Sequence, residues 1–414
     1  MAFTFLDGVF YIYTFLALYM LCFFVIIYIQ NRKEIFSYPQ SKIEPVSIVM
    51  PCYNEEKTIG IAIESLLNLD WPREKMEIIV VDDKSKDNSV NIIKKYVEKY
   101  SNVKLIVNKR NSGGAAEPTN LGVKAARYNY IAVADSDSTP DRLALKKMIG
   151  FLQEDENVGG VTCAIMGKNR DIFIEKLQAI EYSVIAFSRK LLDCVDAVYV
   201  TPGPFAMYKK KVLLEIGLFD TKNMTQDIEI VWRMVYHGYK ARMCLDTSTH
   251  SITPTTVTSW FKQRIRWNIG GMQTMLKYRG YFLRKGMLGA FILPFFVVTW
   301  LTGLLGLGIF VYLLCKKLFL TYLTTKLAAF AGTDLFKLSE LNLHPTVLNF
   351  FGISLAVLGA LFTFLGLSVI KEKELRNKNW FILAFYFLIY LSVYPLVLIT
   401  SVYKFIRGRY SWGR

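Results

Sequence analysis

The sequence predicts an α/β domain built on a parallel sheet and set between α-helices that cross a membrane. Three observations support this fold class. The chain has 414 residues, of which 53% are hydrophobic, so it is long enough for one soluble domain and several membrane spans. Several stretches without any charged residue are as long as a bilayer crossing requires. Between the first two of them, short β-branched runs alternate with amphipathic helical patterns.

The uncharged stretches predict the membrane spans. They are Phe10 to Ile29, Met287 to Cys315, Val347 to Ile370 and Trp380 to Tyr403. The first lacks a basic leading region and a small-residue cleavage site, so it is expected to stay as an anchor. Leu318 to Phe330 is too short for a span and predicts an interfacial or re-entrant helix. Four spans would leave the basic residues Lys404, Arg407 and Arg409 outside, and a further crossing would expose the basic segment Lys371 to Lys378 instead, so the side of the C-terminus stays open.

These features divide the chain into four parts. We expect an anchor and linker over 1–43, a catalytic-type soluble domain over 44–257, amphipathic interface helices over 258–286 and a transmembrane region over 287–414, with spans at about 287–315, 347–370 and 380–403. The net charge of +16 lies largely beside the spans, which favours membrane lipids over nucleic acid as partners. Six cysteines without CxxC spacing fit a reduced compartment.

Polar residues gather where the predicted strands end. The strands Val46 to Met50, Ile78 to Val81, Val103 to Val107 and Tyr130 to Ala134 are each followed by a helical pattern, which predicts a parallel sheet with right-handed crossovers. Ligands of such sheets bind beyond the carboxyl ends of the strands. The sequence therefore predicts a nucleotide-type crevice at that edge.

Asp135 and Asp137 follow directly after a predicted strand. Two carboxylates at one strand end suit a hard divalent cation, Mg²⁺ or Mn²⁺, that bridges the oxygens of a diphosphate. The alternative is a helix N-cap, because the segment from Asp135 to Asp141 also suits a strand-to-helix turn. The strand context and the other carboxylates favour metal binding.

Two further acidic motifs have both a functional and a structural interpretation. Asp83 at one strand end and Tyr53 and Glu55 at the neighbouring one suit the recognition of a base and ribose, or simply form polar turns. Asp227 opens a predicted helix, where it is either an ordinary first-turn acid or a general base for an acceptor hydroxyl.

The segment Gln263 to Trp267 carries two arginines and a tryptophan. Guanidinium groups at Arg264 and Arg266 suit a diphosphate, and the indole of Trp267 offers a flat face on which sugar rings stack. The structural alternative is an amphipathic helix whose long side chains reach the membrane surface.

In this order, these motifs resemble those of the membrane-bound family-2 glycosyltransferases, which include the cellulose, hyaluronan and poly-N-acetylglucosamine synthases. The resemblance covers Val46 to about Gly271 and rests on Pro-Cys-Tyr-Asn-Glu-Glu, Val-Asp-Asp-Lys-Ser-Lys-Asp-Asn-Ser, Asp-Ser-Asp, Thr-Gln-Asp and Gln-Arg-Ile-Arg-Trp. It implies a GT-A (Rossmann-like) fold and inversion at the anomeric carbon of the donor.

The resemblance also implies a role for each motif residue. Tyr53, Glu55 and Asp83 would surround the nucleotide, Asp135 and Asp137 would hold the diphosphate and the metal, and Asp227 would be the general base. Gln263, Arg264 and Arg266 would bind the diphosphate, with Trp267 and Gly203 at the acceptor. Relatives usually carry a glutamate where this chain has Gln226.

The function implied by the resemblance is transfer of a sugar from a nucleotide-sugar donor, expected to be UDP-linked, to a growing extracellular polysaccharide. Transfer of a single sugar to a membrane lipid is the alternative, and an inactive nucleotide-binding scaffold is a third. We expect a multi-pass protein of the plasma membrane with its catalytic domain in the cytosol. An additional crossing, a small accessory membrane subunit or oligomerisation would complete a channel for a polymer.

Overall fold

The computed structural model describes residues 5–284, 286–331, 347–370 and 380–408. In this part of the chain, four helices are long and apolar enough to cross a membrane, and they cover Asp7–Asn31, Leu288–Ala331, Gly352–Val369 and Trp380–Ile406. Each of them overlaps one of the predicted uncharged stretches. Residues 371–379 and 409–414, which include basic residues on either side of the last span, lie outside the described residues.

The first half of the soluble domain has the predicted parallel topology. β1 (Val46–Cys52) pairs in parallel with β2 (Met76–Asp82) and with β4 (Tyr130–Ala134), and β2 pairs in parallel with β3 (Val103–Val107). The connections carry α2 (Ile59–Leu67), the short η1 (Arg73–Lys75), α3 (Ser89–Lys99) and α4 (Ala116–Ala125). Because these strands run the same way, their carboxyl ends share one edge of the sheet.

The second half extends this sheet in a mixed manner that the strand pattern did not predict. Its strands are β5 (Ser138–Pro140), β6 (Val158–Gly167), β7 (Phe205–Lys209) and β8 (Lys240–Ser251), and the order of the eight-stranded sheet is β3-β2-β1-β4-β7-β6-β8-β5. β7 runs antiparallel to β4 and to β6, whereas β6 and β8 are parallel. The helices α5 (Ala144–Glu154), α7 (Lys210–Glu215) and α8 (Gln226–Tyr236) connect these strands.

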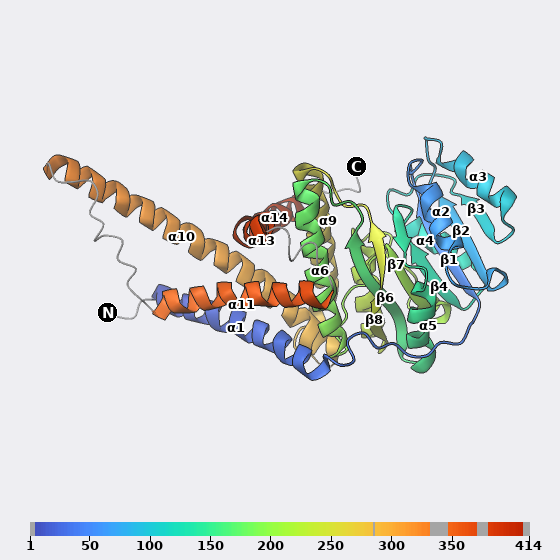
Figure 1. The fold of residues 1–414 in the computed structure, drawn as a ribbon, viewed down its shortest axis with the longest axis horizontal. Coiled ribbons are helices and arrows are strands. Elements are labelled where there is room, and N and C mark those ends of the chain that lie inside the picture. Colours follow the sequence, from blue (N-terminus) through green and yellow to red (C-terminus); the bar gives the residue numbers. More distant parts are fainter. Residues whose placement is uncertain (1–4, 285, 332–346, 371–379, 409–414) are drawn as a thin grey trace.

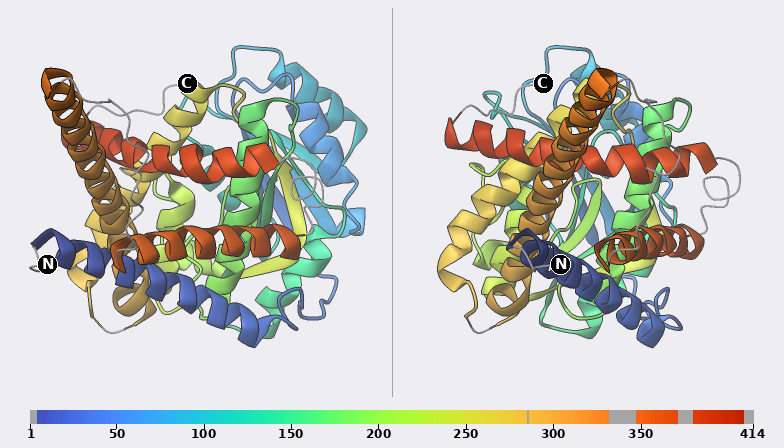
Figure 2. Two further views of the ribbon diagram at one scale, coloured as in Figure 1. Left: turned by 60° about the vertical axis from the view of Figure 1, so that its left-hand side comes forward. Right: turned by 90° about the vertical axis from the view of Figure 1, so that its left-hand side faces the viewer.

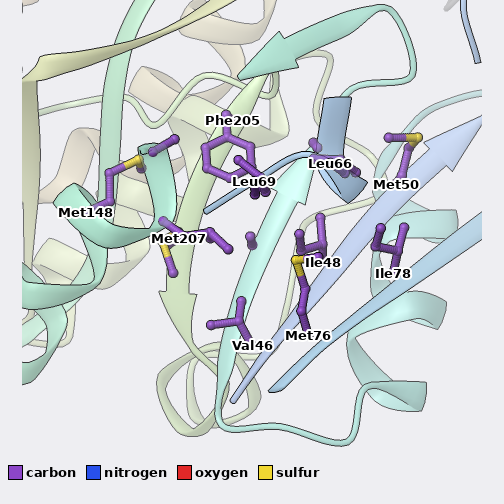
Figure 3. Close-up of a cluster of buried hydrophobic side chains, with 14 of the residues drawn as sticks. Val46, Ile48, Met50, Leu66, Leu69, Met76, Ile78, Met148, Phe205 and Met207 are labelled. Carbon is purple, nitrogen blue, oxygen red and sulfur yellow. The ribbon is translucent and has the colours of Figure 1, made fainter. Parts of the chain in front are cut away.

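One face of the sheet packs on a continuous apolar core. Ile48 and Met50 from β1, Ile78 from β2 and Phe205 and Met207 from β7 lie in one buried cluster, which Figure 3 shows together with Leu66 and Met148 from the covering helices. Alternate residues of β1 supply this cluster, while Val49 faces a second cluster on the other side of the sheet. Burial on both faces fixes the register of the strands, and with it the positions of the polar residues at their ends.

Two long helices lie between the sheet and the membrane helices. They are α6 (Phe173–Asp193) and α9 (Val257–Tyr278), which Figure 1 shows between the sheet and the apolar helices. α1 (Phe5–Asn31) and α11 (Val347–Val369) lie side by side and pack against α6, as Figures 1 and 2 show. The last helices, α13 (Trp380–Phe385), η5 (Tyr386–Tyr390) and α14 (Leu391–Ile406), pack on α6 and α9 through a shared apolar cluster.

The helix after the soluble domain differs from the prediction. After η2 (Arg279–Tyr281) and the π-helical turn η3 (Leu288–Ile292), α10 runs without a break over Leu293–Ala331. Leu318 to Phe330 is therefore the end of this helix and not a separate interfacial or re-entrant segment. At 1.5 Å per residue, the 39 residues of α10 span roughly 58 Å, well beyond the ~30 Å hydrocarbon core of a bilayer. The lysines near residue 317 do not stop the helix, because lysine is a good helix former.

Candidate active site

A cavity of about 540 Å³ lies at the carboxyl ends of β1, β2 and β4 and extends to the membrane helix α10. Almost every residue that the sequence singled out lines it. The lining includes Tyr53, Glu55, Asp83, Asp135, Asp137, Gly203, Asp227, Gln263, Arg266 and Trp267. The single exception among the predicted site residues is Arg264. One cavity thus joins motifs that lie more than 200 residues apart in the sequence.

The end of the cavity formed by β1 and β2 is polar and rigid. Asp83 is buried, and its carboxylate accepts hydrogen bonds from Asn108 Nδ2 at 2.8 Å and from the Ser112 amide at 2.9 Å. Asn54 has a positive φ of 55°, and its amide donates to Ser85 Oγ at 2.9 Å, which ties the ends of the two strands together. This bracing holds Tyr53 and Glu55 beside Asp83 at the cavity wall.

The structure contradicts the helix N-cap interpretation of Asp135 and Asp137. No helix begins at either residue, because Ser138–Pro140 continues as β5 and α5 starts only at Ala144. Both aspartates line the cavity instead. Burial, together with the charges of Asp137 and Asp227, raises the pKa of Asp135 to about 8. Such concentrated negative charge suits a bound divalent cation, which would stabilise the ionised carboxylates.

Gly203 belongs to the wall of this acidic site. A Cβ atom at residue 203 would lie 2.9 Å from both carboxylate oxygens of Asp135. Only glycine therefore lets the loop before β7 approach the carboxylate this closely. Gly203 was expected at the acceptor, and the structure places it directly against Asp135.

Within the described ranges, no cluster of three or more histidine, cysteine, aspartate or glutamate side chains is arranged to hold a metal ion. A cation at Asp135 and Asp137 would therefore complete its oxygen coordination with other ligands, such as phosphate oxygens and water.

Asp227 lies in the first turn of α8 and faces the same cavity. Its Oδ1 accepts a hydrogen bond from the Ile228 amide at 3.1 Å. Burial raises the pKa of this carboxyl group, and the charges of Arg266 and Arg189 and backbone hydrogen bonds offset the increase only in part. A buried carboxylate with a raised pKa is a stronger proton acceptor than an exposed one, as a general base requires.

One broad side of α9, which also includes Asn268, contributes to the cavity. Gln263, Arg266, Trp267 and Gly271 line it, and positions separated by three, four and eight residues share one face of an α-helix. Arg266 interacts electrostatically with both Asp227 and Asp135, so its guanidinium lies near the acidic centre of the cavity.

Arg264 does not face the cavity, which corrects the prediction that it binds the diphosphate. Asn268, one turn further along α9, does line the cavity, so it is the contacts of Arg264 and not its position on the helix that keep its side chain out. Arg264 Nε lies 3.1 Å from Glu181 Oε1 and its Nη2 lies 2.5 Å from Glu181 Oε2. Only 2% of Arg264 is exposed, and its guanidinium carbon lies 4.0 Å from the ring centre of Trp267.

Tyr390 and Tyr394 extend this ion pair into the last membrane helices. Tyr390 OH donates to Glu181 Oε2 at 2.5 Å, and Arg264 Nε donates to Tyr394 OH at 3.0 Å. α6, α9 and the C-terminal helices therefore meet at one buried polar network. Because Arg264 also packs on Trp267, this network positions the side chains of α9 that line the cavity.

α9 is also fixed against the loop that precedes α8. Gln273 Oε1 accepts a hydrogen bond from the Met224 amide at 2.8 Å, and Asn223 Nδ2 donates to Thr274 Oγ1 at 2.9 Å. A Cβ at Gly270 would lie 2.0 Å from Thr225 Oγ1. Close packing at this glycine sets the distance between Asp227 on α8 and Arg266 on α9.

Several cavity residues were not found from the sequence. Arg189 and Tyr182 come from α6, Tyr199 from the loop before β7, and Phe296 and Trp300 from α10. None belongs to a local motif; the only sequence signal for Arg189 is a charged residue within an otherwise apolar helical face.

Comparison with known proteins is consistent with this arrangement. Residues 47–217 match the family model for glycosyl transferase family 2. Over 237 residues, the chain is 31% identical to the poly-beta-1,6-N-acetyl-D-glucosamine synthase of Staphylococcus aureus (strain COL), and over 306 residues it is 29% identical to that of Staphylococcus epidermidis (strain ATCC 35984). The first match covers 57% of each chain, and the second covers 72% of this chain and 73% of the relative.

A solved structure shares the fold over nearly the whole chain. The mannosyltransferase of Pyrobaculum calidifontis, determined in complex with GDP-Man and Mn²⁺, superposes with a TM-score of 0.62 at 18% identity and covers 97% of this chain and 100% of its own. The soluble domain therefore has the GT-A fold, and the chain combines it with apolar helices of membrane-spanning length.

The fold and the match to the family model indicate the class of protein that this chain resembles. Residues 47–217 match the model of glycosyl transferase family 2, and the predicted resemblance to membrane-bound members of that family is confirmed. The match to the Staphylococcus aureus synthase spans 57% of that relative's length, little more than half.

Proposed function

We propose that this protein is an inverting, metal-dependent glycosyltransferase that moves a sugar from a UDP-linked donor to a growing extracellular polysaccharide. The observation that carries this proposal is the single cavity in which Asp83, Asp135, Asp227 and Trp267 meet. Sugar transfer needs four things in one place: recognition of the nucleotide, binding of the diphosphate, a base and a surface for stacking of the sugar. The four side chains are of the types that these tasks require.

The donor occupies the part of the cavity formed by the parallel strands. Tyr53, Glu55 and Asp83 contact the nucleoside, and Gln263 and Arg266 from α9 contact the diphosphate. Asp135 and Asp137 would hold Mg²⁺ or Mn²⁺, and the bound ion would supply Lewis-acid stabilisation of the diphosphate charge. Arg266 adds a fixed positive charge close to the same carboxylates.

Asp227 acts as the general base. It accepts the proton of an acceptor hydroxyl, the hydroxyl oxygen attacks the anomeric carbon, and the bond from that carbon to the diphosphate oxygen breaks with its electron pair on the diphosphate. Attack opposite to the leaving group inverts the anomeric configuration. The rigid wall formed by Gly203 against Asp135 helps to keep the donor in line with the acceptor.

A growing polysaccharide is the favoured acceptor, because the matched relatives are named poly-beta-1,6-N-acetyl-D-glucosamine synthases. The indole of Trp267 lies at the cavity wall, where the terminal sugar of a chain can stack. One observation favours a second candidate, transfer to a membrane lipid. Phe296 and Trp300 of the membrane helix α10 line the same cavity, so an acceptor in the bilayer has direct access. Since nucleotide sugars are cytosolic, we place the catalytic domain on the cytosolic side of the plasma membrane.

The test is nucleoside diphosphate release by the purified protein in lipid nanodiscs. UDP- and GDP-sugars are supplied with Mg²⁺ or Mn²⁺, the wild type is compared with Asp227→Asn, and the product is sized. Metal-dependent release that is lost in Asp227→Asn, together with long product, supports a polysaccharide synthase. One sugar on an extracted lipid selects the second candidate. No release with any donor, metal or added lipid leaves a nucleotide-binding scaffold as the function and refutes the proposal.

A further inference from the structure

Arg189 is a buried cation in the cavity that the proposed donor site does not use. It lies on α6, only 7% of it is exposed, and it lines the cavity, where it interacts with Tyr199, a residue that packs on Phe296 of α10. Its Nε is buried and has no hydrogen-bond partner among the described residues. Burial lowers its pKa, and the favourable effects of Tyr199 and Asp227 are smaller than this burial effect.

Two other buried cations, one on α6 and one on α9, are paired with carboxylates. Lys190, the next residue on α6, places its Nζ 2.7 Å from Asp193 Oδ2 and 2.9 Å from the Met243 carbonyl oxygen. Arg264 on α9 is held by Glu181 through two hydrogen bonds. A buried charge without such compensation costs several kcal/mol. The contrast indicates that Arg189 is compensated by something that enters the cavity.

The surroundings of Arg189 specify the rest of that ligand. Phe296 and Trp300, which line the cavity, belong to the helix segment Leu288–Ala331 that is long and apolar enough to cross a membrane. Tyr199 packs edge to face on Phe296, with ring centres 4.8 Å apart. Ile185 and Ile228 add apolar surface to the wall. An anionic group at Arg189 therefore has Asp227 on one side and the apolar wall of a membrane helix on the other.

We propose that Arg189 forms an anion-binding subsite for the phosphate of a lipid-anchored glycosyl phosphate acceptor. The acceptor sugar lies towards Asp227, its phosphate accepts hydrogen bonds from the Arg189 guanidinium, and its hydrocarbon chain leaves along Phe296 and Trp300. The assignment rests on the proposed glycosyltransferase activity and develops its second candidate, transfer to a membrane lipid, because it names the class of lipid acceptor. An acidic polysaccharide would present a carboxylate at the same place, but it has no use for the apolar wall.

The experiment measures binding in the absence of any nucleotide sugar. Full-length protein in phosphatidylcholine nanodiscs is titrated with two probes, farnesyl-linked N-acetylglucosamine 1-phosphate and the neutral farnesyl N-acetylglucosaminide. Hydrogen bonds between charged groups contribute ~1.5–3 kcal/mol, so we expect the phosphate probe to bind the wild type at least about tenfold more tightly. In Arg189→Met this preference should disappear, and in Arg189→Lys it should be kept in part.

Arg142→Met is the matched control, because it removes an exposed guanidinium outside the cavity and should keep the full preference. The thermal unfolding midpoint of each variant shows whether it is folded. If Arg189→Met does not fold, the wild-type preference and the Arg189→Lys variant carry the test. Equal binding of both probes by the wild type, or an undiminished preference in a folded Arg189→Met, overturns the assignment.

Competition identifies the source of the anion. Unlabelled glycosyl phosphate lipid should displace the probe, whereas inorganic phosphate and an oligomer of glucuronic acid should not. Displacement by either soluble anion at the same concentration refutes the lipid assignment. Because no donor is present, this result is independent of nucleoside diphosphate release, so the subsite and the proposed function can fail separately.

Discussion

Replacing Arg264 with methionine separates the role that the structure gives this residue from the role expected from its motif. Methionine keeps much of the side-chain volume and removes the charge. The change leaves Glu181 buried, with 5% of its side chain exposed, and without the guanidinium that now pairs with it. Removal of one partner of a buried ion pair costs ~3–5 kcal/mol, so we expect the free energy of unfolding of Arg264→Met to be lower than that of the wild type by about that amount.

The effect on turnover follows from the contact with Trp267. Arg264 lies 4.0 Å from the centre of that ring, and Arg266 follows two residues later on the same helix. A displacement of about 1 Å at an active site reduces the rate by roughly 100-fold. We therefore expect kcat of Arg264→Met to fall by about that factor, while UDP affinity stays within about threefold of the wild type, because the guanidinium does not line the cavity.

The assays are thermal unfolding in nanodiscs, nucleoside diphosphate release and titration with UDP and Mn²⁺. Arg266→Met is measured in parallel and should lose nucleotide diphosphate affinity, because its guanidinium lies near the acidic centre. Lys262→Met, an exposed change on the same helix, is the control for loss of one positive charge. The double variant Glu181→Gln with Arg264→Met should regain part of the lost stability, since no charge is then left unpaired.

Two results would refute this reasoning. If Arg264→Met weakens UDP binding as strongly as Arg266→Met does, Arg264 contacts the diphosphate directly, as its motif implied. If Arg264→Met changes neither stability nor kcat, the network of Glu181, Tyr390 and Tyr394 does not position α9.

Other predictions concern the acidic centre and the packing around it. Asp227→Asn should lower kcat by about 10²–10⁴-fold with UDP affinity retained. In the wild type, kcat/KM should rise with pH through a pKa above the ordinary carboxyl range. The reason is that burial raises the pKa of Asp227 and that the base acts only when it is ionised. A flat profile from pH 4 upwards would contradict the second expectation. Gly203→Ala should weaken Mn²⁺ binding in a titration with UDP present, because the new Cβ would lie 2.9 Å from the Asp135 oxygens; unchanged affinity would show that the loop can move. Gly270→Ala should lower the free energy of unfolding by ~1–3 kcal/mol and reduce kcat, since its Cβ would meet Thr225 Oγ1 at 2.0 Å. Unchanged stability and kcat would mean that α8 and α9 separate freely.

Much of the fold was predictable because local patterns determine it. The β-branched runs gave all four parallel strands, and β3 and β4 have the predicted bounds of Val103–Val107 and Tyr130–Ala134. The antiparallel β7 and the mixed second half were missed, since register between distant strands depends on packing that no short window contains. The sequence also did not predict that α10 continues through Leu318 to Phe330, because lysine residues do not indicate where a helix ends.

The sequence by itself determined which acidic residues reach the cavity, because Asp135 and Asp137 follow a strand and Asp227 opens a helix. Strand ends in a parallel sheet must share an edge, and that rule alone brings such residues together. Only the tertiary structure decided which arginines enter the cavity. Arg264 turns to Glu181, a residue 83 positions away in the sequence, while Arg189 from α6 takes a place in the cavity that no motif announced. A local pattern fixes the relative direction of side chains on one helix, but the partner that each direction meets comes from another part of the chain.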